Sequence, residues 1–220
     1  MEATPMYQLY YYPGNASITP HMLLEEIGAP YELQFVDRTK NAHKSPEYLA
    51  LHPSGLIPLL IEGEGEDRLV LHETVAVCLH ILDSNPNSGW TPALGSLERA
   101  QLYKWLCYMT NTMQSTYLTY FYGHRYTTDE AGIEAVAAAA ETRLNGSFDI
   151  LEAALEGKSY LLGEQISVCD LYLLMLSRWG RGMTRPPRSL ANIGALLERV
   201  MERPAVKRTL EQEGIEAPYV

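Results

Sequence analysis

The chain has 220 residues, which is enough for one large domain or two small ones. Its 46% hydrophobic and 20% charged residues are typical of a globular protein and exclude the disordered and fibrous classes. With 17 Lys and Arg against 27 Asp and Glu, the formal net charge is −10, which repels phosphate backbones and anionic lipid. We therefore expect no nucleic-acid partner and no membrane-surface role.

The three cysteines, Cys78, Cys107 and Cys169, are an odd number and lack Cys-x-x-Cys spacing. They argue against a secreted disulfide framework and a zinc ribbon. Each lies in an apolar helical window, so we expect all three to be buried and inert. Residues 6–12 are too short and too polar for a signal peptide, and no stretch reaches about 18 apolar residues. We expect a cytoplasmic protein without a membrane span.

The first segments along the chain alternate between strand and helix patterns. Residues 6–12 are rich in aromatics and stop at Pro13-Gly14, which predicts a strand that runs into a turn. Apolar residues at helical spacing predict a helix over 18–27, which Gly28 ends. Alternating apolar residues predict a second strand over 31–35.

A hairpin pattern follows after a long connection. Residues 57–61 and 68–71 flank an acidic loop that contains glycine, which predicts two antiparallel strands. Apolar spacing then predicts a helix over 75–82. The order β-α-β, long connection, β-β-α is typical of a small mixed sheet with helices.

The rest of the chain has a different pattern. Residues 84–92 are dense in turn formers and indicate a linker, after which no strand is expected. Thr127-x-x-Glu130 and Ser167-x-x-Asp170 each predict a reciprocal cap at the start of a helix. The apolar spacing predicts helices over 97–121, 130–155, 171–179, 193–202 and 205–213.

Four motifs occur in the order and spacing of a known family. They are Pro13-Gly-Asn-Ala-Ser17, His52-Pro-Ser-Gly-Leu-Ile-Pro58-Leu, His72-Glu73-Thr74 and Ser167-x-x-Asp170. Together they resemble the cytosolic glutathione transferases over nearly the whole chain. The resemblance implies an α/β thioredoxin-like glutathione-binding domain over 1–85, a linker over 86–95 and an all-helical C-terminal domain over 96–220. It also implies glutathione as co-substrate, no metal, and a C2 homodimer.

The resemblance further implies how glutathione binds. Pro58 would be preceded by a cis bond, and the Ile57 backbone would pair in strand fashion with the cysteinyl part of the peptide. The alternative for Pro58 is an ordinary edge-strand proline. Thr74 would hold the γ-glutamyl carboxylate at a helix N-terminus, where free N–H groups favour an anion, and Glu73 would set the turn. Thr74 could equally be a plain N-cap.

Two cations are candidates for the glycyl carboxylate of glutathione. Lys40 and His52 lie at the expected place in the sequence, although Lys40 is equally well interpreted as a solvated loop charge.

The reaction needs a thiolate, because the thiolate is the nucleophile and a free thiol has a pKa of about 8.5. A hydroxyl or amide donor at a helix N-terminus favours the anion, and Tyr11, Tyr12, Asn15 and Ser17 are the candidates. The bacterial beta class, which this segment resembles most, has a cysteine where this chain has Ala16. Its absence leaves Ser17, with Asn15 close by, as in serine-type transferases and β-etherases of this fold. The beta-class histidine also corresponds to a different residue here, Gln114.

The proline at position 20 bears on the Ser17 assignment. If Ser17 is the N-cap, Pro20 is the third helical residue and has no N–H for the serine to accept. The hydroxyl is then freer to meet a ligand, unless it caps the Thr19 N–H instead. Tyr11 is the alternative activator, or a packed strand residue.

The electrophile would meet an aromatic region of the second domain. We predict that Tyr108, Met113 and Tyr117 line the electrophile pocket. Tyrosine suits such a pocket because it offers apolar area with a polar tip. Met113 and Tyr117 also fall at core spacing with Tyr103, Leu106 and Thr110, so packing is the alternative. The region contains Tyr103, Tyr108, Tyr117, Tyr120, Phe121, Tyr122 and Tyr126.

Other charged and polar residues carry weaker hypotheses. A basic cluster at Arg178, Arg181, Arg185 and Arg188 indicates a solvated face, a dimer contact or a site for an anionic electrophile. The remaining histidines lack metal spacing and are expected at the surface or in packing; they are His21, His43, His80 and His124.

These features favour a cytoplasmic, detoxifying transferase that conjugates glutathione to a small hydrophobic electrophile. The alternatives are a glutathione-dependent lyase or dehalogenase, a disulfide reductase, and a non-catalytic binding or regulatory protein on the same fold.

Overall fold

The computed structural model describes residues 7–65 and 67–220, so Met6 of the first predicted strand lies outside it. The chain divides into two compact units. The first holds the chain up to Thr91 together with Glu202–Ala217, and the second holds Pro92–Met201 with Pro218–Val220. Within the described residues, no helix has the length and apolar character that a membrane span requires.

The first unit is built on a four-stranded sheet in the order β2-β1-β3-β4. β1 pairs with β2 in parallel, whereas the β1–β3 and β3–β4 pairs are antiparallel. Leu9 in β1 lies opposite Leu60 in β3, and both side chains are buried. The strands are β1 (Tyr7–Tyr11), β2 (Tyr31–Phe35), β3 (Leu59–Glu62) and β4 (Leu69–His72).

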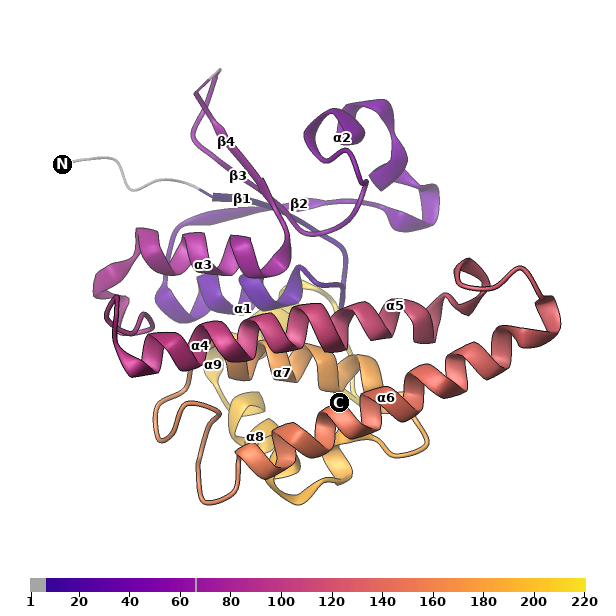
Figure 1. Cartoon of the computed structure of the whole chain (residues 1–220). Helices are drawn as coiled ribbons and strands as arrows, with labels where there is room; N and C mark the ends of the chain where they lie inside the picture. The colour runs from indigo at the N-terminus through magenta and orange to yellow at the C-terminus, as the bar shows by residue number, and fades with distance from the viewer. Residues whose placement is uncertain (1–6, 66) are drawn as a thin grey trace. The chain divides into compact units, whose positions relative to one another are not determined.

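Helices cover both faces of this sheet. α1 (Ile18–Ile27) and α3 (Thr74–Ser84) pack together on one face, and α2 (Pro46–Leu51) lies on the other (Figure 1). α9 (Pro204–Gln212), from the end of the chain, packs against α1. Gly28 ends α1 as predicted, with a φ of 67° that glycine adopts without strain. This is the predicted thioredoxin-like arrangement.

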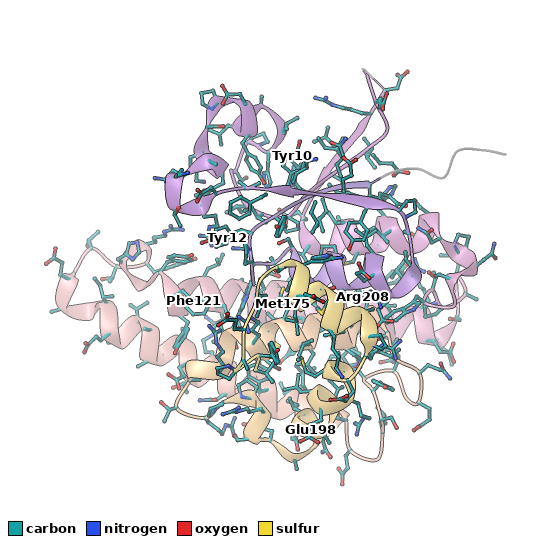
Figure 2. The ribbon with its side chains drawn as sticks, turned by 180° about the vertical axis from the view of Figure 1, so that it is seen from behind. Tyr10, Tyr12, Phe121, Met175, Glu198 and Arg208 are labelled. Atoms are coloured by element: carbon teal, nitrogen blue, oxygen red, sulfur yellow. The ribbon has the colours of Figure 1, made fainter. Side chains whose placement is uncertain are left out.

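The long connection before the hairpin contains structure that the sequence did not predict. Two 3₁₀ turns, η1 (Arg38–Lys40) and η2 (Ala42–Lys44), precede α2. The Ser45 hydroxyl caps α2 by accepting from the Tyr48 N–H at 3.2 Å, and the Tyr48 hydroxyl donates to the Leu56 carbonyl at 2.6 Å. Tyr48 packs in a small core that also receives Tyr10 and Tyr12 from the end of β1 (Figure 2).

The second unit is helical, which confirms the predicted class of the C-terminal domain. The predicted helix over 97–121 is continuous but contains a π-helical segment, η4 (Met109–Gln114). α7 is buried along almost its whole length and forms the core of the unit. The α-helices are α4 (Leu97–Tyr108), α5 (Ser115–Phe121), α6 (Ile133–Ala154), α7 (Val168–Trp179) and α8 (Ala191–Met201). Short 3₁₀ turns lie at η3 (Pro86–Ser88), η5 (Gly123–Arg125), η6 (Glu130–Gly132), η7 (Gly180–Gly182) and η8 (Pro187–Ser189).

One of the two predicted helix caps is confirmed. At the start of α7, the Asp170 carboxylate accepts from the Ser167 N–H at 2.8 Å and also from the Leu161 N–H at 2.9 Å. The capping box predicted from Thr127 is wrong, because Asp129 occupies the N-cap and accepts from the Ala131 N–H at 3.1 Å. Asp129 lies next to the first free N–H groups and accepts from one of them, so the Thr127 side chain does not cap this turn.

The predicted burial of the cysteines is confirmed for two of the three. Cys78 and Cys169 are buried, and burial raises the pKa of the Cys78 thiol. Cys107 is exposed, so its predicted burial is wrong. It follows Tyr103 and Lys104 by one helical turn and shares their exposed face of α4, although the surrounding window is apolar.

Candidate functional site

A tight turn joins β1 to α1 and delivers Ser17 to the start of the helix. Gly14 has a φ of 66°. The Asn15 N–H donates to the Tyr12 carbonyl at 3.0 Å, and the Ile18 N–H donates to the Asn15 carbonyl at 3.0 Å. These bonds turn the chain directly from the strand into the helix, with Ser17 as the N-cap.

The Ser17 hydroxyl is not used as a cap. Its side chain makes no capping hydrogen bond, and its Oγ is fully buried without a partner among the described residues. The alternative that Ser17 bonds to the Thr19 N–H is therefore excluded, and Pro20, as the third helical residue, has no N–H to offer. A buried hydroxyl without a partner costs about 1–3 kcal/mol, so an unpaired one calls for an explanation.

Asn15 and Tyr11 are two of the other candidates for thiol activation. The Asn15 Oδ1 accepts from the Ala16 N–H at 2.8 Å, which holds the side chain and leaves its Nδ2 donors unengaged by other described residues. Tyr11 is half-buried, and its ring contacts Phe35 and His21. Burial, and then the nearby Glu213 carboxylate, raises the pKa of Tyr11, so it stays protonated at neutral pH.

The Ile57–Pro58 peptide bond is cis. Ile57 is buried beside Tyr48 and Leu59, and no hydrogen bond joins its backbone to another described residue. Its N–H and C=O are therefore available to an extended peptide.

The start of α3 has an unusual backbone. Glu73 has a φ of 76° and a ψ of 114°, a conformation that costs a non-glycine residue about 1–3 kcal/mol. Glu73 is the N-cap but makes no side-chain capping bond, and the buried Thr74 is the first helical residue. The alternative that Thr74 is a plain N-cap is therefore wrong. The first-turn N–H groups remain suited to an anion.

The two candidate cations have different surroundings. Lys40 is exposed and forms an ion pair with Asp37 at 3.4 Å, which favours the solvated-loop interpretation. His52 is buried at the end of α2 and stacks on His72. Burial, followed by the nearby His72, lowers the pKa of His52, so at neutral pH it offers a hydrogen bond and not a charge.

The candidate pocket residues of the second unit also differ in how far they are buried. Met113 and Tyr117 are fully buried, and the Tyr117 hydroxyl donates to the Leu176 carbonyl at 2.8 Å. These placements favour the packing alternative for both. Tyr108 is partly exposed and meets the ring of Trp105 edge-on. Gln114 accepts a hydrogen bond from the Tyr172 hydroxyl.

Arginines of the basic cluster bond to carbonyl and carboxylate groups of the second unit. Arg178 donates to the Tyr219 carbonyl at 2.6 Å, and Arg185 pairs with Asp149 at 2.8 Å. These contacts favour a structural role over an anion site. No group of three or more side chains suited to a metal ion occurs in 7–65 and 67–220.

Sequence reasoning missed one buried polar group in the first unit. Glu213 contacts His21 and the Gly14 backbone, although 199 residues separate it from Gly14. No local pattern marks such a pair, because the contact exists only after α9 has packed on α1.

Two family models match the chain. The one described as "Glutathione S-transferase, N-terminal domain" covers residues 5–83, and the one for the C-terminal domain covers residues 103–204. A solved glutathione S-transferase from Xylella fastidiosa is 31% identical, with a TM-score of 0.84 over 96% of this chain and 100% of that one. The chain belongs to the glutathione S-transferase family. Since both family domains are present, it is an enzyme of that family.

Other transferases are similar over the same length. A glutathione transferase homologue from Sulfitobacter, solved with bound glutathione, is 26% identical with a TM-score of 0.86 and covers 96% of this chain and 99% of its own. Glutathione S-transferase GST-4.5 of Xanthomonas campestris is 28% identical over 94% of this chain and 99% of its own. The glutathione S-transferase fold predicted from the sequence is confirmed.

Proposed function

We propose that this transferase conjugates the glutathione thiolate to a small hydrophobic electrophile, with Ser17 stabilising the thiolate. The observation that carries the proposal is the buried Ser17 hydroxyl at the N-terminus of α1, which has no hydrogen-bond partner among residues 7–65 and 67–220. The Sulfitobacter homologue with bound glutathione supports glutathione as the co-substrate.

The chemistry follows from the groups of this turn. The Ser17 O–H donates to the sulfur anion, and the Asn15 Nδ2 group is the second donor. Hydrogen bonds to the charged form and the α1 dipole both lower the pKa of a bound thiol from about 8.5. The thiol proton passes to solvent, and the sulfur then forms a bond to the electrophilic carbon while the leaving group departs with its electron pair. Tyr11, with its raised pKa, is a donor and not a base.

The peptide part of glutathione is assigned to the same unit. The unengaged Ile57 backbone before Pro58 supports strand-like pairing with the cysteinyl residue. The strained Glu73 turn and the Thr74 hydroxyl, beside the α3 N-terminus, suit the γ-glutamyl carboxylate. Contacts of glutathione with Lys40 or His52 stay predictions.

Other properties stay predictions as well. They are the roles of Tyr108, Met113 and Tyr117 toward the electrophile, the homodimer, the cytoplasmic location, a role in detoxification, the beta-class relationship and the domain boundaries at 85 and 96.

The test is a steady-state assay with chlorodinitrobenzene and saturating glutathione. Ser17→Ala is expected to lower turnover about 10-fold or more, because one positioned donor to the anion is lost. Tyr11→Phe, the matched control, is expected to change it much less. Equal turnover of the wild type and Ser17→Ala overturns the serine assignment. Glutathione binding by the wild type without conjugation would favour a lyase or disulfide reductase, and no binding at all would favour a non-catalytic protein.

A further inference from the structure

A buried carboxylate near the end of the chain contacts the thiolate-binding turn. Glu213, which follows α9, is 3% exposed. Its Oε2 accepts from the Gly14 N–H at 2.8 Å, and its Oε1 lies 2.9 Å from the His21 Nδ1. Both oxygens of the carboxylate are therefore engaged, one by the turn and one by α1.

The partners of His21 determine its hydrogen bonding. Its Nε2 lies 2.6 Å from the Oε1 of Gln212, and the Gln212 Nε2 donates to Glu25 at 3.0 Å, which fixes the orientation of that amide. Both ring nitrogens of His21 therefore face oxygens of α9 and the residue that follows it.

The two contacts of Glu213 lie on either side of Ser17. Gly14 precedes Ser17 by three residues, and His21 follows it by one helical turn and donates its N–H to the Ser17 carbonyl at 3.1 Å. One carboxylate thus bridges the turn and the first turn of the helix. This arrangement restricts how the Ser17 N-cap can move relative to α1.

α9, which Glu213 follows directly, is itself held against α1. Arg208, on α9 in Figure 2, donates to Glu25 at 2.7 Å, and Arg203 forms a two-pronged pair with Glu26. The position of the Glu213 carboxylate is therefore set by several polar contacts besides its own.

We propose that Glu213 is a positioning residue for the thiolate-binding turn, which it clamps through Gly14 and His21 so that the Ser17 hydroxyl keeps its direction. This inference rests on the proposed role of Ser17. Glu213 does not touch the substrate in this account.

The test compares Glu213→Ala, Glu213→Gln and the control Glu211→Ala, an exposed glutamate in the last turn of α9, all in the full chain. The readouts are hydrogen exchange of the Gly14 amide by NMR, which needs no activity, and kcat and KM for glutathione. Glu213→Ala is expected to speed Gly14 exchange about 10-fold or more and to lower kcat by about 10-fold, because small displacements of a positioned group are costly. KM is expected to change less, since Ile57 and Thr74 hold the peptide.

Glu213→Gln provides the rescue. Its side-chain oxygen can still accept from the Gly14 N–H, so we expect values within about threefold of the wild type. This variant also keeps the test valid if Glu213→Ala fails to fold.

The outcomes separate the two proposals. Unchanged kcat in a folded Glu213→Ala, or equal loss in Glu213→Gln and Glu213→Ala, overturns the positioning role while the wild type remains an active transferase. Absence of glutathione binding and turnover in the wild type overturns the proposed function itself, before any variant is compared.

Discussion

The imidazole rings of His52 and His72 stack with their centroids 4.3 Å apart and their planes 17° from parallel. His52 ends α2, and His72 ends β4 immediately before the strained Glu73. The pair thus joins the segment before the cis Ile57–Pro58 bond to the start of α3. Both parts are assigned to glutathione in the proposed function, so the protonation of His52 matters for the site.

This stack predicts a loss of stability in acid. Burial, the neighbouring His72 and Lys44 lower the pKa of His52, and Glu73 only partly opposes them. A histidine whose folded-state pKa lies below the unfolded value of about 6.5 contributes stability that is fully present above that pH and is lost as the pH falls through the folded-state value. The free energy of unfolding is therefore expected to fall as the pH drops below about 6.5.

Urea unfolding of the wild type and His52→Asn at several pH values between 8 and 5 measures this effect. The substitution removes the titrating ring. We expect the variant to lose less stability on acidification than the wild type. Parallel pH profiles for the two proteins would contradict the assignment.

The Thr74 hydroxyl predicts a change in glutathione affinity. Thr74→Val keeps the shape of the side chain but removes the hydrogen bond proposed to the γ-glutamyl carboxylate, so KM for glutathione is expected to rise about 10-fold or more. The chlorodinitrobenzene kcat is expected to stay nearly constant, because the contact is made equally in the ground and transition states. Thr74→Ser, the matched control, keeps the hydroxyl and should change KM by less than about threefold. An unchanged KM in Thr74→Val rules out the contact.

Local patterns predicted the elements well where packing and capping agree with them. The helix from Ile18 to Gly28 combines apolar periodicity with a glycine end, and α7 combines a reciprocal cap with an apolar run. α2 was missed because six residues are too few for periodicity to be recognised, and its anchor is a tertiary bond from Tyr48 to Leu56.

Local patterns also predicted part of the site. That the Ser17 hydroxyl makes no capping bond could be argued from Pro20, three residues away, because both lie in one helical turn. The clamp by Glu213 could not be argued, because it joins residues 199 positions apart through two polar groups that have no sequence period. Likewise, the spacing of Tyr117 allowed a core position, but the bond of its hydroxyl to the Leu176 carbonyl is specified by no pattern within α5.

The Ser167–Asp170 cap predicts a large effect on stability. Asp170→Ala leaves the buried N–H groups of Leu161 and Ser167 without their acceptor, at a cost of about 1–3 kcal/mol each. Ser167→Ala removes only the side-chain part of the cap and is expected to cost about 1 kcal/mol. Chemical denaturation measures both. The control is Asp149→Ala, whose exposed ion pair with Arg185 is expected to contribute less than about 1 kcal/mol; a loss in Asp170→Ala no larger than this contradicts the account.

The exposure of Cys107 predicts a selective thiol reaction in the folded protein. Cys78 and Cys169 are buried, and burial also raises the pKa of the Cys78 thiol, which lowers its thiolate fraction. Iodoacetamide at pH 8 is therefore expected to modify one thiol per native chain and three after denaturation. Peptide mapping should place the single label on Cys107, and Cys107→Ser should abolish native labelling. Labelling of Cys78 or Cys169 at a comparable rate in the native protein would show that the core opens far more readily than its packing implies.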